Sequence, residues 1–452
     1  MSKTLFKEFD SVSAKQWKQK IQFDLKGADY NDTLVWHTNN DISVKPFYHS
    51  DDFKTFPPVS NTKATNWKIC ETIFVANTEK SNLKSINALN KGADSIKFII
   101  PSKDVSIESL LKNIHLTSTE IHFELQFLSP NFVTELIKTS TEKNFYINVD
   151  VIGNLAKTGN WFNNLNDDFL EFKTIVNQTN SLCINASLYQ NAGANMVQQL
   201  AYTLAHTNEY LNYLKDINKT TNVIFNVSIG SNYFFEIAKL RALRLLWETL
   251  ASEYQINTNC HIFATPTKRN KTIYDYNTNM LRTTTECMSA ILGGANTINN
   301  LPYDAIFHKN NEFSDRIARN QLLILKHESY FNKVNNPADG AYYIESLTNQ
   351  LADKALTLFK NIESNGGFLK QLKVGTVQRK IKEYAAKEQN QFNAGKEILL
   401  GSNKHPNPKD KMKGNLELYP FVKTYQRKTL IEPIIEKRLA ENLEQQRLKE
   451  EN

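Results

Sequence analysis

The stretch NVIFNVSIGSNYFFEIAKLRALRLLWETLASEY, residues 222–254, contains a strand and a helix in direct succession. Its first part, NVIFNVSI (222–229), alternates polar and apolar side chains as a half-polar strand does. After Gly230, apolar residues recur at helical spacing through residues 231–254. The stretch therefore predicts one βα unit.

The same succession of strand and helix continues on both sides, from about residue 67 to residue 330. The strand candidates are KICETIFV (68–75), SIKFII (95–100), IHFELQFL (121–128), FYINVDV (145–151), LCINASL (182–188), NVIFNVSI (222–229), CHIFATP (260–266) and ANTINN (295–300). Eight strands alternating with helices predict an α/β fold of the closed (β/α)8, or TIM barrel, type. A doubly wound open sheet is the alternative, but the sequence contains no GxGxxG or GxxxxGK[ST] phosphate loop.

The first residues form a unit of their own, an N-terminal arm covering 1–64. Ser13 can cap a helix over about 13–25, which Gly27 ends. The stretches TLVWHT and ISVKPFY, joined by NND, predict a hairpin after that helix. The apolar stripe of the helix consists of Trp17, Ile21 and Leu25. A small arm with such a stripe packs either on its own chain or on a partner.

We place the barrel at 65–400 and a C-terminal extension at 401–452. The extension begins with a turn-rich linker, GSNKHPNPKDK (401–411). From residue 428 it becomes a tail that is dense in charge. The tail can form a surface helix, but its composition favours a solvated or frayed terminus.

Several predicted strands carry a polar side chain at every second position. Period two puts the members of each pair on one face. The helix-covered outer face cannot hold them cheaply, because a buried polar group without a partner costs about 1–3 kcal/mol. The polar face is therefore expected to point into the barrel, as a lumen for a polar, elongated ligand or as a hydrogen-bonded core with ordered water. The pairs are Asn148 and Asp150, Asn185 and Ser187, and Asn226 and Ser228.

Composition sets wider bounds. The 452 residues are 40% hydrophobic and 22% charged, which is the balance of a soluble globular protein. The net charge is +7, but the sequence contains no run of basic residues interleaved with aromatic ones, so we expect no nucleic-acid partner. Apolar runs are too short for a membrane span or a signal peptide, so we expect no membrane association. The four cysteines are scattered without paired spacing, which fits a cytoplasmic protein without a disulfide framework.

Candidate reactive residues form no familiar catalytic pattern. Arg282, and the pair Arg316 and Arg319 one helical turn apart, could bind an anion, but structural salt bridges are the expected role. No histidine stands in HxxxH or HExxH spacing, so no metal site is predicted, and no serine lies in GxSxG. The histidines that end or flank strands are His122, His261 and His308.

Over about residues 65–404 the sequence resembles the substrate-binding barrel of methylmalonyl-CoA mutase. The opening LFKEFDSVSAKQWKQKIQFDLKGADY resembles the small (β) subunit of the heterodimeric enzyme in this family. The other blocks that carry the resemblance are QNAGANMVQQLAYTLAHTNEYL, FFEIAKLRALRLLW, NTNMLRTTTECMSAILGGANTI, FSDRIARNQLLILKHES, NPADGAYYIESLTNQLADKA, NGGFLK and GSNK. The resemblance implies a radical interconversion of methylmalonyl-CoA and succinyl-CoA that uses adenosylcobalamin, with coenzyme A threaded along a hollow, polar barrel axis.

The sequence departs from the catalytic members of that family in three places. Aligned on AGA, Ser187 and Leu188 stand where the resemblance implies a tyrosine and a histidine that touches the thioester carbonyl. A TGTIQND stretch that supplies substrate contacts has no clear counterpart in VIGNLAKTGNWFNN. No histidine stands in the Asp-x-His-x-x-Gly signature of the cobalamin-binding domain, so we expect no such domain and no cofactor on this chain.

These departures lead to one main expectation and two alternatives. We expect a non-catalytic small subunit that stabilises a large subunit carrying adenosylcobalamin, with no catalytic residue of its own. We expect the lumen candidates Asn148, Asn185, Ser187, Asn226 and Ser228 to be the residues that face any ligand. The alternatives are a stand-alone barrel that binds or processes acyl-CoA, and a cobalamin enzyme that recruits a separate cobalamin-binding protein.

Overall fold

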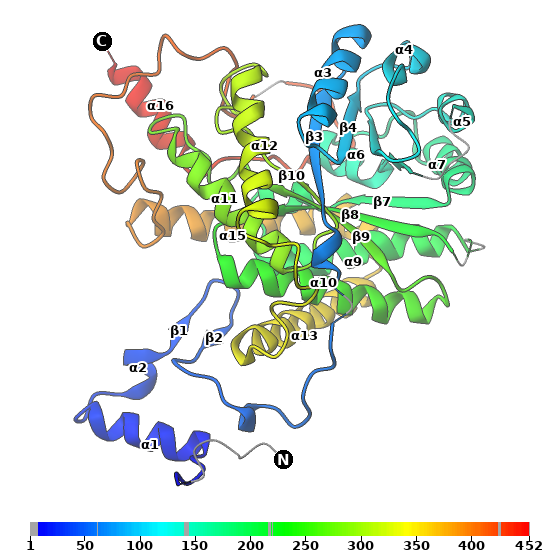
Figure 1. Cartoon of the computed structure of the whole chain (residues 1–452). Helices are drawn as coiled ribbons and strands as arrows, with labels where there is room; N and C mark the ends of the chain where they lie inside the picture. Colours follow the sequence, from blue (N-terminus) through cyan, green and yellow to red (C-terminus); the bar gives the residue numbers. More distant parts are fainter. Residues whose placement is uncertain are drawn as a thin grey trace.

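The computed structural model describes residues 8–60, 62–139, 144–215, 218, 220–423 and 426–451, and residues 1–7 of the predicted arm lie outside this range. It consists of an arm, an eight-stranded barrel and a C-terminal extension (Figure 1). The barrel strands are β3 (Lys68–Phe74), β4 (Ser95–Ile100), β5 (Glu120–Leu125), β6 (Phe145–Asn148), β7 (Ser181–Asn185), β8 (Asn222–Ile229), β9 (Cys260–Pro266) and β10 (Thr297–Asn299). All eight predicted strands are present, and the predicted (β/α)8 fold is confirmed.

The strands are parallel and hydrogen-bonded in the order β6-β5-β4-β3-β10-β9-β8-β7. The two ends of this order, β6 and β7, lie side by side and complete the barrel without a ladder of their own. Three predicted strands run three residues too far: 121–128 ends at Leu125, 145–151 ends at Asn148, and 182–188 ends at Asn185, because Ser187–Asn191 forms a short helix instead. The register places Asn148 beside Glu124 and Asn185 beside Asn226, so the polar positions of neighbouring strands share one face.

Helices cover the outside of the barrel. The longest helix of the βα units, α10 (Tyr233–Glu253), buries Trp247 completely and packs against α9 and α13. No helix in the described ranges is long and apolar enough to cross a membrane. The helices of the βα units are α3 (Thr78–Asn90), α4 (Ile107–Leu111), α5 (Pro130–Lys138), α6 (Val151–Thr158), α7 (Leu165–Thr179), α8 (Ser187–Asn191), α9 (Met196–Tyr213), α10, α11 (Thr278–Leu292) and α12 (Glu312–His327), followed by α13 (Tyr342–Ser364), α14 (Phe368–Lys373) and α15 (Thr376–Asn393).

The arm extends away from the barrel (Figure 1). Ser13 caps its first helix in a capping box with Gln16, as its sequence indicates. The hairpin is also present, and in the turn between its strands Asn40 accepts a hydrogen bond from the backbone N–H of Met196 at 2.9 Å, which ties the arm to the barrel. The first helix buries none of its residues. The arm elements are α1 (Ala14–Asp24), α2 (Tyr30–Leu34), β1 (Trp36–His37), β2 (Ser43–Val44) and the 3-10 helices η1 (Ser50–Asp52) and η2 (Ala64–Asn66).

The C-terminal tail packs on the barrel, which corrects the expectation of a solvated terminus. It ends in α16 (Glu441–Glu450), as one alternative expected. Glu444 is 1% exposed and accepts a hydrogen bond from the backbone N–H of Ile273 at 2.9 Å. The guanidinium of Arg438, on the segment before α16, donates to the carbonyl of Lys271 at 3.0 Å. The charge of the tail is therefore used in buried pairs with the loop that follows β9.

Candidate functional site

A cavity of about 380 Å³ lies where the barrel strands end. Four of the five predicted lumen residues line it, namely Asn185, Ser187, Asn226 and Ser228. Asn148 does not line it, although the residue is 3% exposed and follows the same polar face. The carboxyl ends of the strands are where TIM barrels hold their reactive groups, so this cavity is the candidate ligand site.

Charged pairs on one wall of the cavity were not expected from the sequence. The ammonium of Lys97 lies 2.6 Å from the carboxylate of Glu124, across the β4–β5 ladder. The charge of Lys97 lowers the pKa of Glu124 against the raising effect of burial. Burial would lower the pKa of Lys97, but the Glu124 carboxylate raises it. Both groups are therefore charged at neutral pH, and neither has the shifted pKa that acid–base catalysis there needs.

Two amides of the polar face have atoms without hydrogen-bond partners. The amide nitrogen of Asn226 donates to the sulfur of Cys183 at 3.1 Å, but its buried oxygen has no partner among the described residues. In Asn148, neither the amide oxygen nor the amide nitrogen has one. Because such atoms cost free energy when left unpaired, water or a polar ligand is the expected partner at Asn226.

Bulky rings occupy the barrel below the cavity. The ring of His122 stacks on that of Tyr146 with 4.7 Å between centroids, and Phe263 meets His122 edge-on at 4.8 Å. The Tyr146 and His261 rings are 4.9 Å apart. These rings pack around the barrel axis next to the cavity, because Phe263 belongs both to the ring layer and to the cavity lining.

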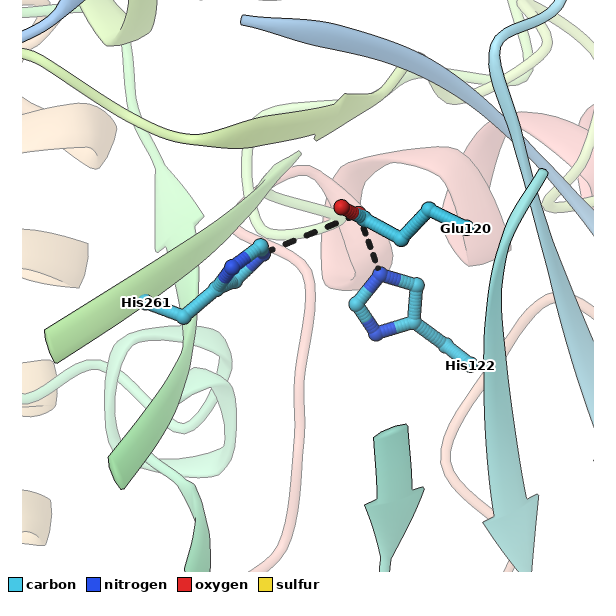
Figure 2. Close-up of side chains that lie close together, drawn as sticks. All are labelled: Glu120, His122 and His261. Atoms are coloured by element: carbon cyan, nitrogen blue, oxygen red, sulfur yellow. Dashed lines mark hydrogen bonds and ion pairs between the residues drawn. The ribbon is translucent and has the colours of Figure 1, made fainter. Parts of the chain in front are cut away.

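At the start of the strands, Glu120 lies between His122 and His261 (Figure 2). An oxygen of Glu120 is 2.8 Å from Nε2 of His122 and 3.9 Å from Nε2 of His261. The hydroxyl of Thr297 donates to the same oxygen at 2.6 Å. Burial would raise the pKa of Glu120, but the His122 and His261 rings lower it to about 2. Burial lowers the pKa of both histidines, that of His261 to about 3, so the carboxylate is ionised and the rings are neutral.

Sequence spacing could not reveal this cluster. Glu120 and His122 stand on β5, whereas His261 stands on β9, so only the closed barrel brings them together. The one available signal was the EIH alternation at the start of a strand, which places Glu120 and His122 on the same face.

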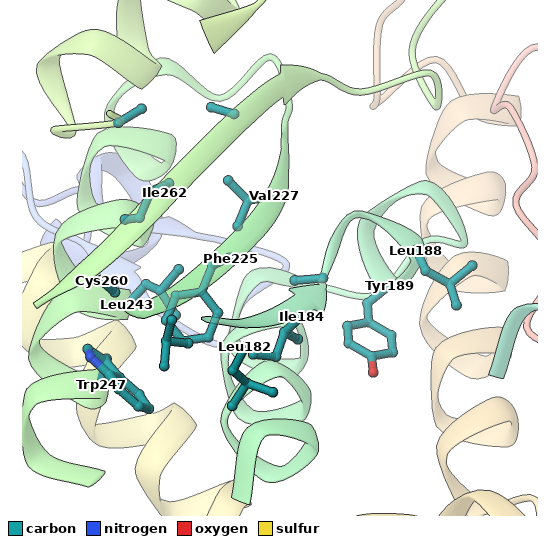
Figure 3. Packing of buried hydrophobic residues seen from close by; sticks show 14 of the residues in the cluster. Leu182, Ile184, Leu188, Tyr189, Phe225, Val227, Leu243, Trp247, Cys260 and Ile262 are labelled. Carbon is teal, nitrogen blue, oxygen red and sulfur yellow. The ribbon is translucent and has the colours of Figure 1, made fainter. Parts of the chain in front are cut away.

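Ser187 and Leu188 are the first two residues of the short helix α8 after β7, and Figure 3 shows Leu188 on that helix. The side chain of Ser187 lines the cavity. Leu188 is 3% exposed and belongs to the main hydrophobic core. An aliphatic side chain can neither donate a hydrogen bond to a carbonyl oxygen nor stabilise charge that develops on it.

Behind α8, three side chains form a chain of hydrogen bonds that resembles a nucleophile, base and acid. The hydroxyl of Tyr189 bonds Nδ1 of His206 at 2.9 Å, and Nε2 of His206 bonds the carboxylate of Asp150 at 2.9 Å. Tyr189 is 0% exposed, and burial raises its pKa well above the ordinary value. A phenol that no substrate can reach is not a nucleophile, so this chain is structural.

Asp150 links β6 to β7, the two neighbouring strands that share no ladder; we call the place where they meet the seam. It caps α6 by accepting from the backbone N–H of Gly153 at 2.7 Å. It also accepts from the backbone N–H of Asn185, on β7, at 2.7 Å. The hydroxyl of Tyr210 donates to it at 2.5 Å. Asp150 therefore joins the two strands that no ladder joins, and does not face the ligand cavity as its strand pattern predicted.

We predict that Asp150→Asn lowers the free energy of unfolding by about 1–3 kcal/mol at neutral pH, because its carboxamide leaves buried donors unpaired. Burial would raise the pKa of Asp150, but His206 and Tyr210 lower it below its usual value. The stability that the carboxylate supplies is therefore present above the unfolded pKa of about 3.9 and is lost as the pH falls through the folded pKa. Urea unfolding at neutral and acidic pH measures this. The difference in unfolding free energy between wild type and variant should become smaller in acid. A difference that stays constant with pH would contradict the role assigned to Asp150, and so would an equal loss of stability in the exposed control Asp104→Asn.

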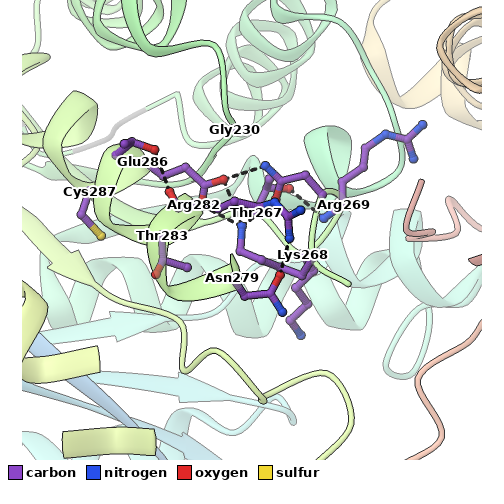
Figure 4. A network of polar contacts seen from close by, with 12 residues as sticks. Gly230, Thr267, Lys268, Arg269, Asn279, Arg282, Thr283, Glu286 and Cys287 are labelled. Carbon is purple, nitrogen blue, oxygen red and sulfur yellow. Dashed lines mark hydrogen bonds and ion pairs between the residues drawn. The ribbon is translucent and has the colours of Figure 1, made fainter. Parts of the chain in front are cut away.

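The candidate anion-binding arginines have structural partners. Arg282 donates to Thr272, Asn279 and the carbonyl of Leu400, and it belongs to the polar network around Glu286 (Figure 4). Arg319 forms an ion pair with Glu71 on β3, as expected. The guanidinium of Arg316 lies 5.5 Å from the ring centre of Phe313. His308 bonds Asp304 and Asn415.

Comparison with known proteins places the chain in a family. Residues 151–450 match the methylmalonyl-CoA mutase family. The chain is 34% identical over 443 residues to the methylmalonyl-CoA mutase small subunit of Porphyromonas gingivalis, covering 89% of this chain and 71% of that one. It is 29% identical to the methylmalonyl-CoA mutase of Rhizobium meliloti, over 86% of this chain and 64% of that one.

The methylmalonyl-CoA mutase large subunit of Porphyromonas gingivalis is also similar, with 34% identity over 51% of this chain and 34% of that one. The match to the Rhizobium mutase covers less than two thirds of that relative's length. With most of its length matched, and with the barrel in place, the chain belongs to the methylmalonyl-CoA mutase family.

Proposed function

We propose that this chain is the non-catalytic small subunit of a cytoplasmic, heterodimeric, adenosylcobalamin-dependent methylmalonyl-CoA mutase. In this proposal the large subunit interconverts methylmalonyl-CoA and succinyl-CoA, and this chain stabilises it. The observation that carries the proposal is the buried Leu188 on α8, beside the cavity, where catalytic relatives are expected to hold a histidine. The four buried cysteines, all unpaired, are consistent with a reducing compartment.

Two ion pairs of the cavity wall occupy groups that could otherwise act on a substrate. Lys97 pairs with Glu124 and Arg319 pairs with Glu71, and a layer of rings lies below the cavity. Ser187 offers a hydroxyl that, among the described residues, makes no hydrogen bond to a histidine or a carboxylate that could act as its base. A thioester carbonyl placed here would meet no strong hydrogen-bond donor at α8.

The residues at this end of the barrel do not fit a cobalamin. The resemblance implies that cobalamin is held by a domain with the signature Asp-x-His-x-x-Gly, and that signature is absent from these residues. The histidine that lines the cavity, His308, is held by Asp304 and Asn415. The chain's own Met412 and Phe421 pack with Phe307 in a small core beside it. We therefore assign the cofactor to the partner.

The test is reconstitution with the cognate large subunit. Co-expression should give a one-to-one complex on size-exclusion chromatography, and the complex should isomerise methylmalonyl-CoA when adenosylcobalamin is added. The purified chain alone, given the same coenzyme and substrate, should show no turnover. Separate elution of the two chains, or turnover by this chain alone, would overturn the proposal.

The second candidate, an acyl-CoA-binding barrel, is favoured by the unpaired oxygen of Asn226 at the cavity. Binding to the native state raises the melting temperature of a protein, so titration of the isolated chain with CoA esters addresses it. A rise that Asn226→Ala abolishes supports the second candidate, whereas no rise removes it.

A further inference from the structure

The cluster of Glu120, His122 and His261 joins opposite walls of the barrel. Glu120 and His122 stand on β5, and His261 stands on β9. In the strand order, β4, β3 and β10 separate these strands on one side, and β6, β7 and β8 separate them on the other. The three side chains point toward one another (Figure 2), and Glu120 is the first residue of β5, whereas the cavity of Asn226 and Ser228 lies where the strands end.

The three ligand atoms are close enough to share one ion. They lie within 4.8 Å of one another, and the carboxylate oxygen is 2.8 Å and 3.9 Å from the two Nε2 atoms. Tetrahedral coordination at 2.0–2.2 Å separates neighbouring ligand atoms by about 3.4 Å. The two separations from the Glu120 oxygen lie on either side of this value, and the pair of imidazole nitrogens must close by at most about 1.4 Å to reach it.

The cluster is polar, buried and not closed by its own hydrogen bonds. His122 is 0% exposed, and its Nδ1 has no partner among the described residues. The side chains of Glu120 and His261 keep 16% and 12% exposure, so an ion or water can reach them from outside the barrel. Two neutral imidazoles and one carboxylate have the lone pairs that a divalent ion requires.

We propose that Glu120, His122 and His261 form a binding site for a divalent transition-metal ion of the Zn²⁺ class. Two imidazoles and a carboxylate suit Zn²⁺ and other divalent first-row transition-metal ions, whereas Mg²⁺ and Ca²⁺ prefer oxygen ligands alone. The ion takes the place of the protons that now link the two rings to Glu120 and Thr297, and each ring then carries its proton on Nδ1. The Thr297 hydroxyl, 2.6 Å from the Glu120 oxygen and 3.0 Å from Nε2 of His261, or a water from solvent would complete the coordination.

An ion held there links β5 to β9 across the barrel. Because a preformed site is absent from the unfolded chain, metal binding adds to folding stability. Lys97 is the cation on β4 beside His122, and its pairing with Glu124 reduces its repulsion of the ion. Arg244 also lies near His261 but donates to the carbonyl oxygens of Cys260 and Gly294.

The experiment uses the untagged full-length chain, stripped with a chelator and titrated with Zn²⁺ by calorimetry. One ion should bind per chain, and saturation should raise the melting temperature. Co²⁺ titration should give the intense visible bands of a four-coordinate ion with nitrogen and oxygen ligands. Glu120→Gln, which preserves the shape of the side chain, and His261→Asn, which removes the ligand nitrogen Nε2, should each weaken binding more than about tenfold. The control His115→Ala, an exposed histidine in the loop that precedes β5, should bind as the wild type does.

Two results would contradict the metal site. No stoichiometric Zn²⁺ binding by the wild type, or equal affinity in Glu120→Gln and His261→Asn, would overturn the proposal. If the variants do not fold, the wild-type Co²⁺ spectrum decides, because a six-coordinate spectrum or none contradicts a three-side-chain site. The proposal concerns this chain alone and does not depend on its partner.

Discussion

Deleting residues 1–28 is expected to abolish stable assembly with the large subunit, weakening binding more than about 100-fold, while leaving the barrel folded. The first helix, α1, buries none of its residues. Its main described contacts stay within the arm, where Trp17 meets Phe47 edge-on and Lys18 lies over the ring of Tyr30. The truncated chain still contains Asp29, whose side chain caps α2.

The reason to expect an interface is the apolar surface of the arm. Monomeric proteins seldom expose large apolar patches without a partner. Single large side chains often dominate binding energy, so replacing the best exposed one is informative. The large apolar side chains of the described arm with more than two fifths of their surface exposed are Phe9 at 70%, Val12 at 55%, Trp17 at 49%, Phe23 at 79%, Trp36 at 52%, Phe56 at 67% and Val59 at 75%.

Chromatography and calorimetry of the truncated chain with the large subunit measure the loss, and circular dichroism checks the fold. Phe23→Gln should weaken binding about 30-fold, corresponding to a hot-spot residue of about 2 kcal/mol. Lys15→Gln, at an exposed position of the same helix, is the control and should bind normally. Full affinity after truncation would place the interface elsewhere on the barrel.

The fold could be predicted from the sequence because its signals are local. Alternation within strands such as 222–229 and helical spacing in 231–254 each extend over enough residues to identify the element. The end of β7 was missed because Ala186, Ser187 and Leu188 fit both the end of a strand and the first turn of a helix. The tertiary contact between α8 and β8 decides between them.

The site was less predictable because its features depend on distant contacts. The polar residues at the ends of β7 and β8 were found by their alternation, and they line one cavity. Asn148 follows the same alternation, but the next polar residue, Asp150, turns away to close the seam and cap α6. The cluster of Glu120 and His261 needs strands on opposite sides of the barrel, which no sequence spacing encodes.

Breaking the buried ion pair between Lys271 and Glu286 is expected to cost about 3–5 kcal/mol of unfolding free energy. The ammonium of Lys271 lies 2.8 Å from one oxygen of Glu286 and 3.0 Å from the other, and each residue is 1% exposed. Asn270 donates to the same carboxylate at 2.6 Å. The pair joins the loop after β9 to α11, and the carbonyl of Lys271 accepts from Arg438 of the tail.

In Glu286→Ala the ammonium remains buried without its counter-charge. Burial already lowers the pKa of Lys271, and the Glu286 carboxylate opposes that effect, so removing Glu286 should lower the pKa further. The unfolded chain then binds more protons than the folded chain at any pH between this folded pKa and about 10.4. Stability of Glu286→Ala should therefore rise with pH over that window, more steeply than in the wild type.

Urea unfolding at neutral and alkaline pH measures both the loss and its recovery. Replacing both partners, as in Lys271→Met with Glu286→Leu, removes the uncompensated charge, so the double variant should be more stable than Glu286→Ala. Glu328→Ala, at an exposed position just past the end of α12, is the matched control and should change little. The ion pair does not hold this end of the barrel to the tail if Glu286→Ala lowers the unfolding free energy by less than about 1 kcal/mol. The same conclusion follows if the stability of Glu286→Ala does not rise with pH. A large loss of unfolding free energy with that pH dependence would show that the pair positions the loop after β9. Because Arg438 of the tail binds this loop, the tail would then belong to the folded barrel.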